Sequence, residues 1–254
     1  MIKVFVTPQQ INQGTVVITG GDAHHLRSVL RKKPDDLILI GVSGGAEEQS
    51  YEARIISVEP EQVACQLLER IQISSESPLR TYLYQAVAKG DKMDLIIQKS
   101  VELGVTEIIP FFSRYTVVRL EEAKSRQRQE RWQKIAEAAA KQCRRDAIPK
   151  VHMPRSFAAM TAELAERRPG HLLLLPYEQE RKCSLADLRE RLQDQYPQEV
   201  SIVIGPEGGF CPDEVERIRN INGEIITLGR RILRTETAAV AVLALVQFLW
   251  GDIG

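Results

Sequence analysis

The sequence predicts an α/β protein with two domains, and three observations support this fold class. From residue 82 onward, short apolar runs of strand length alternate with segments of helix length, which is typical of a mostly parallel sheet covered on both faces. Residues 1–73 carry short β-rich runs punctuated by Gly and Pro. The polar stretch 74–78 separates the two patterns. We therefore predict a small β-barrel at residues 1–73 and an α/β domain at residues 74–254.

The barrel is expected to contain strands at residues 2–6, 15–18, 37–42, 51–58 and 63–70. Asp22 is suited to cap one helix at residues 23–31, which carries His24, His25, Arg27 and Arg31. Two interpretations remain open. The helix is either a solvated basic helix with a packed histidine or the phosphate-contacting face of an RNA-binding barrel.

The α/β domain is expected to contain strands at residues 82–88, 106–112, 172–175, 200–204 and 225–228. Helices are expected at residues 91–103, 121–145, 157–168, 185–193, 212–220 and from about 235. The helix at 121–145 is basic and amphipathic, so it either presents a solvated polar face or binds a polyanion. Three strands end at Pro176, Gly205 and Gly229. If these strands are neighbours, their loops form one crevice at the carboxyl ends of the strands.

Composition excludes several classes of protein. The chain has 254 residues, of which 43% are hydrophobic and 27% charged, as in ordinary globular proteins. Its 34 basic and 34 acidic residues balance, which argues weakly against a general polyanion binder. The N-terminus lacks the features of a secretory signal, and the longest apolar run, 238–250, suits a buried helix, so we expect a cytoplasmic protein without a membrane span. The four cysteines are far apart, which predicts neither disulfides nor a metal site.

The loop at 205–209 is rich in glycine but lacks both the P-loop pattern and the GxGxxG spacing. Glu207 would also repel a pyrophosphate. A neutral or cationic ligand fits better, because glycines let the backbone approach an adenine and a ribose while Leu228, Ile232 and Leu233 supply apolar walls. The alternative is that these glycines serve only tight turns.

The order of two motifs points to a family. GPEGGF at 205–210, followed by LGRRILRTETA at 228–238 and an apolar terminal helix, resembles the C-terminal signature of the SPOUT class of S-adenosylmethionine-dependent RNA methyltransferases. Within that class it resembles the RsmE family, which methylates N3 of a uridine in the RNA of the small ribosomal subunit. HHLRSVLR at 24–31, KSVELGV at 99–105 and the stretch 131–143 are also similar to that family, so the resemblance covers nearly the whole chain.

The resemblance implies a PUA-like RNA-binding barrel at 1–73 and a SPOUT methyltransferase domain at 74–254 with a C-terminal trefoil knot. It also implies a homodimer, S-adenosylmethionine as cofactor, and 16S ribosomal RNA or the assembled small subunit as partner. Cofactor contacts are expected at Leu175, Pro176, Gly205, Glu207, Gly208, Leu228, Gly229, Ile232, Leu233 and Thr237. RNA contacts are expected at His25, Arg27, Arg31, Arg144, Arg230 and Arg231.

Methylation of uridine N3 requires loss of a proton, so the site needs a carboxylate base or a cation that stabilises the anionic uracil oxygens. Arg234 is the first candidate for the cation, since a guanidinium donates two hydrogen bonds to a planar acceptor. A phosphate clamp is its alternative role. Glu236 is expected to orient Arg234, to accept the proton or only to complement the helix dipole. Glu207 is a further candidate base that could instead bond a ribose hydroxyl.

One residue departs from the family pattern, because Cys211 stands where the family often has Ser or Thr. Cysteine is a poor helix cap, which predicts a loss of local stability of about 1 kcal/mol. Two other functions stay open on the same residues. One is methylation of another RNA atom, such as a ribose 2′-oxygen, and the other is a non-catalytic ribosome-assembly factor that binds RNA.

Overall fold

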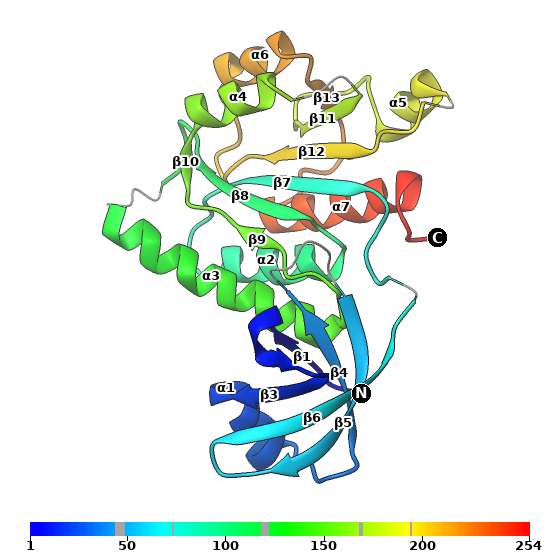
Figure 1. Cartoon of the computed structure of the whole chain (residues 1–254). Helices are drawn as coiled ribbons and strands as arrows, with labels where there is room; N and C mark the ends of the chain where they lie inside the picture. Colours follow the sequence, from blue (N-terminus) through cyan, green and yellow to red (C-terminus); the bar gives the residue numbers. More distant parts are fainter. Residues whose placement is uncertain (44–48, 73, 118–121, 168–169, 194) are drawn as a thin grey trace. The chain divides into compact units, whose positions relative to one another are not determined.

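The computed structural model describes residues 1–43, 49–72, 74–117, 122–167, 170–193 and 195–254 (Figure 1). The chain forms two compact units. The first contains Met1–Glu76 and Ala140–Ile148, and the second contains Ser77–Ala139 and Pro149–Gly254. Among the described residues, no helix is both long enough and apolar enough to cross a membrane.

The first unit is built on one mixed six-stranded sheet. Its strands are β1 (Lys3–Val6), β2 (Ile11–Asn12), β3 (Thr15–Thr19), β4 (Leu37–Val42), β5 (Gln49–Val58) and β6 (Gln62–Arg70). They follow the order β1-β4-β5-β6-β3-β2, in which only the β1–β4 pair is parallel. Alternate residues of these strands point to a shared core that also includes Ala23 and Leu26.

The second unit contains a parallel sheet in the order β10-β8-β7-β12-β11-β13, with β9 also paired to β8. The strands are β7 (Arg80–Ala86), β8 (Glu107–Phe112), β9 (Lys150–Val151), β10 (Arg155–Ser156), β11 (His171–Pro176), β12 (Glu199–Ile204) and β13 (Glu224–Ile226). The helices are α2 (Lys92–Glu102), α3 (Glu122–Cys143), α4 (Phe157–Ala165), α5 (Leu185–Leu192), α6 (Pro212–Asn220) and α7 (Thr235–Trp250). An α/β fold with a mostly parallel sheet is therefore confirmed.

Helices cover both faces of this sheet, as Figure 1 shows for the second unit. On one face, residues of α4 and α6 join a core with inward-facing strand residues that include Tyr84, Phe111 and Leu175. On the other face, α7 packs against β7, β12 and α2. Strands buried on both faces read as continuous apolar runs, which is why β11 has the sequence LLLL at 172–175.

The elements differ from the sequence prediction in three places. The helix expected at 23–31 is a short helix α1 (Gly20–His24) followed by a π-helical turn (His25–Val29), and Arg31 lies beyond it with a left-handed φ of 52°. The short strands β2, β9 and β10 were not predicted, because two residues carry no readable periodicity. Helix α4 ends at Ala165, earlier than expected.

Candidate functional site

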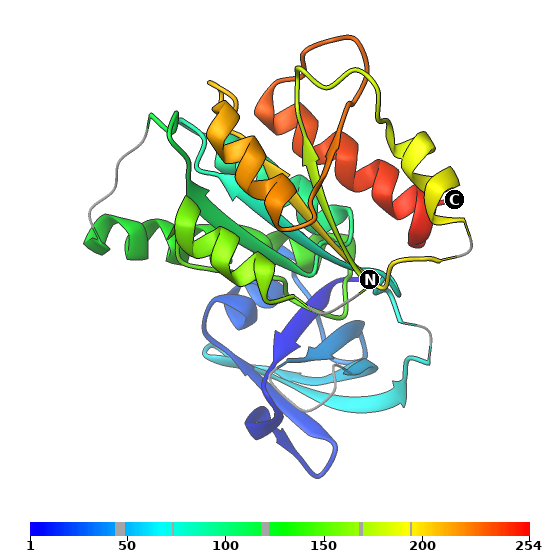
Figure 2. The same ribbon diagram turned by 90° about the horizontal axis from the view of Figure 1, so that it is seen from above.

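A cavity of about 510 Å³ opens at the carboxyl ends of β11, β12 and β13. Its lining comes from the segment after β11, the glycine loop after β12, the loop between β13 and α7, and Lys92 of α2. Strand β11 pairs with both β12 and β13, so the three strand ends are neighbours, as expected. Figure 2 shows the loop before α7 beside the segment after β11, where Thr227 N–H donates to the Cys183 carbonyl at 2.8 Å.

Glycine is needed at several points of the cavity wall. A Cβ on Gly205 would lie 3.0 Å from the Phe210 ring, and one on Gly209, whose φ is 69°, would lie 2.8 Å from a Glu178 oxygen. Gly229 has a φ of 104°, which side chains of L residues rarely adopt, and open space surrounds the position of its absent Cβ. Gly205 and Gly209 therefore permit close packing within the protein, whereas Gly229 exposes bare backbone to the cavity.

The two glycine motifs are held together by Thr235. Its hydroxyl donates to the Gly205 carbonyl oxygen at 2.7 Å and accepts a hydrogen bond from the buried Gln85 side chain at 3.0 Å. Thr235 is itself buried at the first position of α7. This contact fixes the distance between the loop after β12 and the start of α7.

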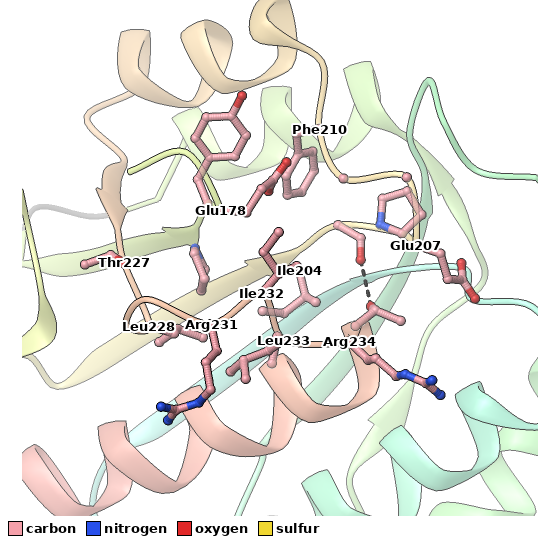
Figure 3. A pocket seen from close by; sticks show the side chains of 18 of the residues that line it. Glu178, Ile204, Glu207, Phe210, Thr227, Leu228, Arg231, Ile232, Leu233 and Arg234 are labelled. Carbon is pink, nitrogen blue, oxygen red and sulfur yellow. Dashed lines mark hydrogen bonds between the residues drawn. The ribbon is translucent and has the colours of Figure 1, made fainter. Parts of the chain in front are cut away.

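Two of the charged side chains that line the cavity lie near one end of it (Figure 3). Glu207 and Arg234 lie there, away from Thr227 (Figure 3). Lys92 Nζ is 2.9 Å from Glu207 Oε1 and 3.8 Å from Glu236 Oε2. Burial disfavours the Glu207 carboxylate, but hydrogen bonds from Lys92 Nζ and the Lys89 N–H outweigh this effect, so the pKa of Glu207 lies below its ordinary value.

The cavity brings together most of the residues expected to contact a cofactor. Its lining includes Pro176, Gly205, Glu207, Gly208, Leu228, Gly229, Ile232 and Leu233. Leu175 and Thr237 are outside the lining, since the Leu175 side chain is buried in the core and Thr237 is exposed on α7. Of the candidate catalytic residues, Arg234 and Glu207 line the cavity. Glu236 is outside the lining, and its Oε2 lies 3.8 Å from Nζ of the cavity-lining Lys92.

The expected RNA contacts are divided between the two units. His25, Arg27, Arg31 and Arg144 belong to the first unit, and Arg230 and Arg231 to the second. Arg27 Nη1 donates to the Pro60 carbonyl at 2.8 Å, so part of its hydrogen-bonding capacity is used within the fold. Arg230 and Arg231 are exposed, and Arg231 also lines the cavity.

Several residues that line the cavity were not predicted from the sequence as site residues. Tyr177, Glu178 and Arg181 follow the end of β11, a position that could have marked them, because ligands bind at the carboxyl ends of parallel strands. Lys92 gives no such signal, since it starts a helix more than a hundred residues before its partner Glu207. Among the described residues, no His, Cys, Asp or Glu group could hold a metal ion.

Comparison with known proteins defines the class. Residues 75–247 match the family model of the RNA methyltransferase domain. The chain is 35% identical to ribosomal RNA small subunit methyltransferase E of Bacillus subtilis, covering 96% of this chain and 94% of that protein. It also resembles the crystal structure of a ribosomal RNA small subunit methyltransferase E from Neisseria gonorrhoeae bound to S-adenosyl methionine, with 32% identity, a TM-score of 0.86 and full coverage of both chains. The chain therefore belongs to the RNA methyltransferases and, within them, to the ribosomal RNA small subunit methyltransferase E family.

Proposed function

We propose that this protein uses S-adenosylmethionine to methylate N3 of a uridine in 16S ribosomal RNA of the small subunit. The observation that carries this proposal is a cavity with bare glycine backbone and apolar walls that has carboxylates and a guanidinium group at one end. The Neisseria gonorrhoeae relative, whose structure contains S-adenosyl methionine, supports the choice of cofactor.

The residues of the cavity fit this cofactor. Leu228, Ile232 and Leu233 offer apolar surface to an adenine, and the backbone at Gly229 is open to a ligand. The lining carries charged side chains of both signs, which are the acidic Glu178 and Glu207 and the basic Lys92, Arg181, Arg231 and Arg234. When bound, S-adenosylmethionine supplies an electrophilic methyl carbon, whose bond to sulfur breaks with the electron pair kept by sulfur as the carbon bonds the acceptor nitrogen.

The chain's own residues must orient the uracil and remove the N3 proton. Arg234 ends the cavity-lining loop, and among the described residues its guanidinium group has no ion-pair partner. We assign it to the uracil oxygens, which gain negative charge as the proton leaves. The candidate bases are Glu207 and Glu236, which share the ammonium group of Lys92.

The rest of the molecule supports RNA binding and dimer formation in this proposal. The first unit is a PUA-like barrel whose basic residues His25, Arg27, Arg31 and Arg144 contact RNA, and Arg230 and Arg231 contact it beside the site. The segment before α7 forms the trefoil knot of the SPOUT class. In the homodimer, α7 contacts a second copy of the chain through its exposed apolar residues Leu245 and Phe248. Because the proposed substrate is ribosomal RNA, we expect the protein to act in the cytoplasm.

The test uses labelled S-adenosylmethionine with small-subunit RNA, or with whole subunits that lack the modification. Identification of the labelled nucleoside should give uridine methylated at N3. Label on a ribose 2′-oxygen would favour the rival methyltransferase activity. Calorimetry of cofactor binding tests the other alternative, a non-catalytic assembly factor, because a protein of that kind needs no cofactor. As a control, Gly229→Val should abolish cofactor binding, since the side chain would enter the cavity from a backbone that disfavours it.

A further inference from the structure

Two carboxylates beside the cavity share one ammonium group. Lys92 starts helix α2, Glu207 belongs to the glycine loop after β12, and Glu236 lies in the first turn of α7. Lys92 Nζ is 2.9 Å from Glu207 Oε1 and 3.8 Å from Glu236 Oε2. One cation therefore connects both glycine motifs to a third element.

The two carboxylates are bound very differently. Glu207 Oε1 accepts hydrogen bonds from Lys92 Nζ at 2.9 Å and from the Lys89 N–H at 3.2 Å. Glu236 Oε2 is buried and accepts no hydrogen bond from any described residue, and its side chain is only 15% exposed, against 32% for Glu207. A buried carboxylate oxygen without a donor is costly, so such groups require an explanation, and a catalytic role is one of the recognised explanations.

We infer that Lys92 is a positioning residue that gives the two carboxylates different roles in the proposed reaction. It anchors Glu207 in the cofactor loop and leaves the Glu236 carboxylate as the acceptor of the N3 proton. Glu236 then returns this proton to water after the product leaves. The inference rests on the proposed function and adds to it the identity of the base and of the residue that prepares it.

The charges around Glu236 support this division. Lys92 faces it from α2, and Glu207 is held by the same ammonium group. Arg234 precedes it by two residues, and Glu236 lies in the first turn of α7. The acidic residues beside Lys92 are Asp91, the N-cap of α2, and Asp94 on α2, and both pair with Arg131 of α3. Loss of the Lys92 charge should therefore affect the Glu236 carboxylate more than loss of any other nearby cation.

The first test needs neither cofactor nor RNA. Side-chain carboxyl carbons of ¹³C-labelled glutamate are titrated by NMR, and the Glu236 signal is identified by its loss in Glu236→Gln. In Lys92→Met the titration of this signal should move to higher pH, because Lys92 Nζ lies 3.8 Å from Glu236 Oε2 and an opposite charge nearby favours the carboxylate. Lys92→Arg, which keeps the charge, should restore the wild-type value. An unchanged Glu236 pKa in a Lys92→Met protein with a native amide spectrum would overturn the inference.

The second test follows single-turnover methylation against pH, with the cofactor Kd measured by calorimetry. Glu236→Gln should slow the reaction by about 10²–10⁴-fold with an unchanged Kd. Glu207→Gln should weaken cofactor binding and keep the acid limb of the profile, and Lys92→Met should move this limb to higher pH. If the acid limb of the pH–rate profile disappears in Glu207→Gln and remains in Glu236→Gln, the assignment of Glu236 as the base is wrong. If the wild type labels another RNA atom, the proposed function fails, and the NMR titration still decides the role of Lys92.

Discussion

The hydroxyl group of Thr235 shows how one side chain shapes the site. It bonds the Gly205 carbonyl oxygen at 2.7 Å and the Gln85 amide at 3.0 Å, so it connects the glycine loop, the start of α7 and the centre of the sheet. Its neighbours Arg234 and Glu236 take their positions from this anchor. Thr235 is buried, whereas Arg234 is exposed, which matches a structural role for the first and a ligand-directed role for the second.

Arg234 carries the first prediction. Arg234→Ala should lower the rate of methylation by about 10²–10³-fold, because it removes a donor aimed at developing negative charge. Cofactor affinity measured by calorimetry should stay the same. Arg231→Ala is the matched control in the same loop, and it should raise the KM for RNA with kcat unchanged. Parallel loss of cofactor binding in Arg234→Ala would show that this residue holds the cofactor instead.

Among the elements, helix α6 shows how a weak cap is compensated. Cys211 is the N-cap residue, and its thiol makes no capping hydrogen bond. Glu214 stabilises the start of the helix instead, because its buried carboxylate accepts hydrogen bonds from the Cys211 N–H at 3.1 Å and the Arg114 N–H at 2.8 Å. The sequence predicted the weak cap but not the contribution of Arg114, which comes from the loop after β8.

Cys211→Ser should raise the free energy of unfolding by about 1 kcal/mol, because a serine hydroxyl can accept the Glu214 N–H at this N-cap. Urea titration measures the change. Cys65→Ser is the control, and it should lower the free energy of unfolding. Burial raises the pKa of Cys65 to about 11, and a hydroxyl placed in that apolar core should cost about 1–3 kcal/mol. Equal destabilisation of both variants would contradict the capping argument.

At the scale of the whole molecule, α7 determines the expected assembly. Its buried side packs on the sheet, yet Phe248 is 62% exposed and Leu245 is 44% exposed. Phe248→Glu should dissociate the proposed homodimer into monomers, as measured by light scattering, because it places a charge in an apolar contact. Ile56→Glu, at an exposed apolar position on β5, should leave the assembly state unchanged. A dimer that persists in Phe248→Glu would exclude this face as the interface.

A buried ion pair links the ends of the first unit. Lys3 Nζ contacts Asp146 Oδ1 at 2.6 Å, and Ser50 and the Ser75 N–H also bond this carboxylate. Burial alone would raise the pKa of Asp146, but these hydrogen bonds lower it to about 2. The pair therefore contributes stability that is complete above pH ~4 and is lost as the pH falls toward the folded pKa.

Lys3→Met should destabilise the protein by about 3–5 kcal/mol at neutral pH, because it leaves a buried carboxylate without its cation. The difference from wild type should narrow as the pH falls from ~4 to ~2, where Asp146 becomes protonated. Chemical denaturation at a series of pH values measures this. Lys99→Met, which breaks a half-buried pair with Glu102, should cost less than Lys3→Met, and about 1 kcal/mol at most. A constant difference across this pH range would exclude Asp146 as the group responsible.

Local patterns in the sequence determined the α/β class, the long elements of the second unit and the three strand ends that line the cavity. These features are readable because apolar periodicity and glycine position report the local backbone directly. The grouping of Pro176, Gly205 and Gly229 also followed, since neighbouring parallel strands end at one edge of a sheet.

Only the tertiary structure decided which distant side chains meet. Lys92 and Glu207 are separated by 115 positions, and Lys3 and Asp146 by 143, yet each pair is in contact. Sequence periodicity extends over a few turns of helix or one strand, so it carries no information on contacts at this separation. The two glycine motifs were therefore evident from the sequence alone, whereas the cation that connects Glu207 and Glu236 became visible only when the sheet brought α2 beside them.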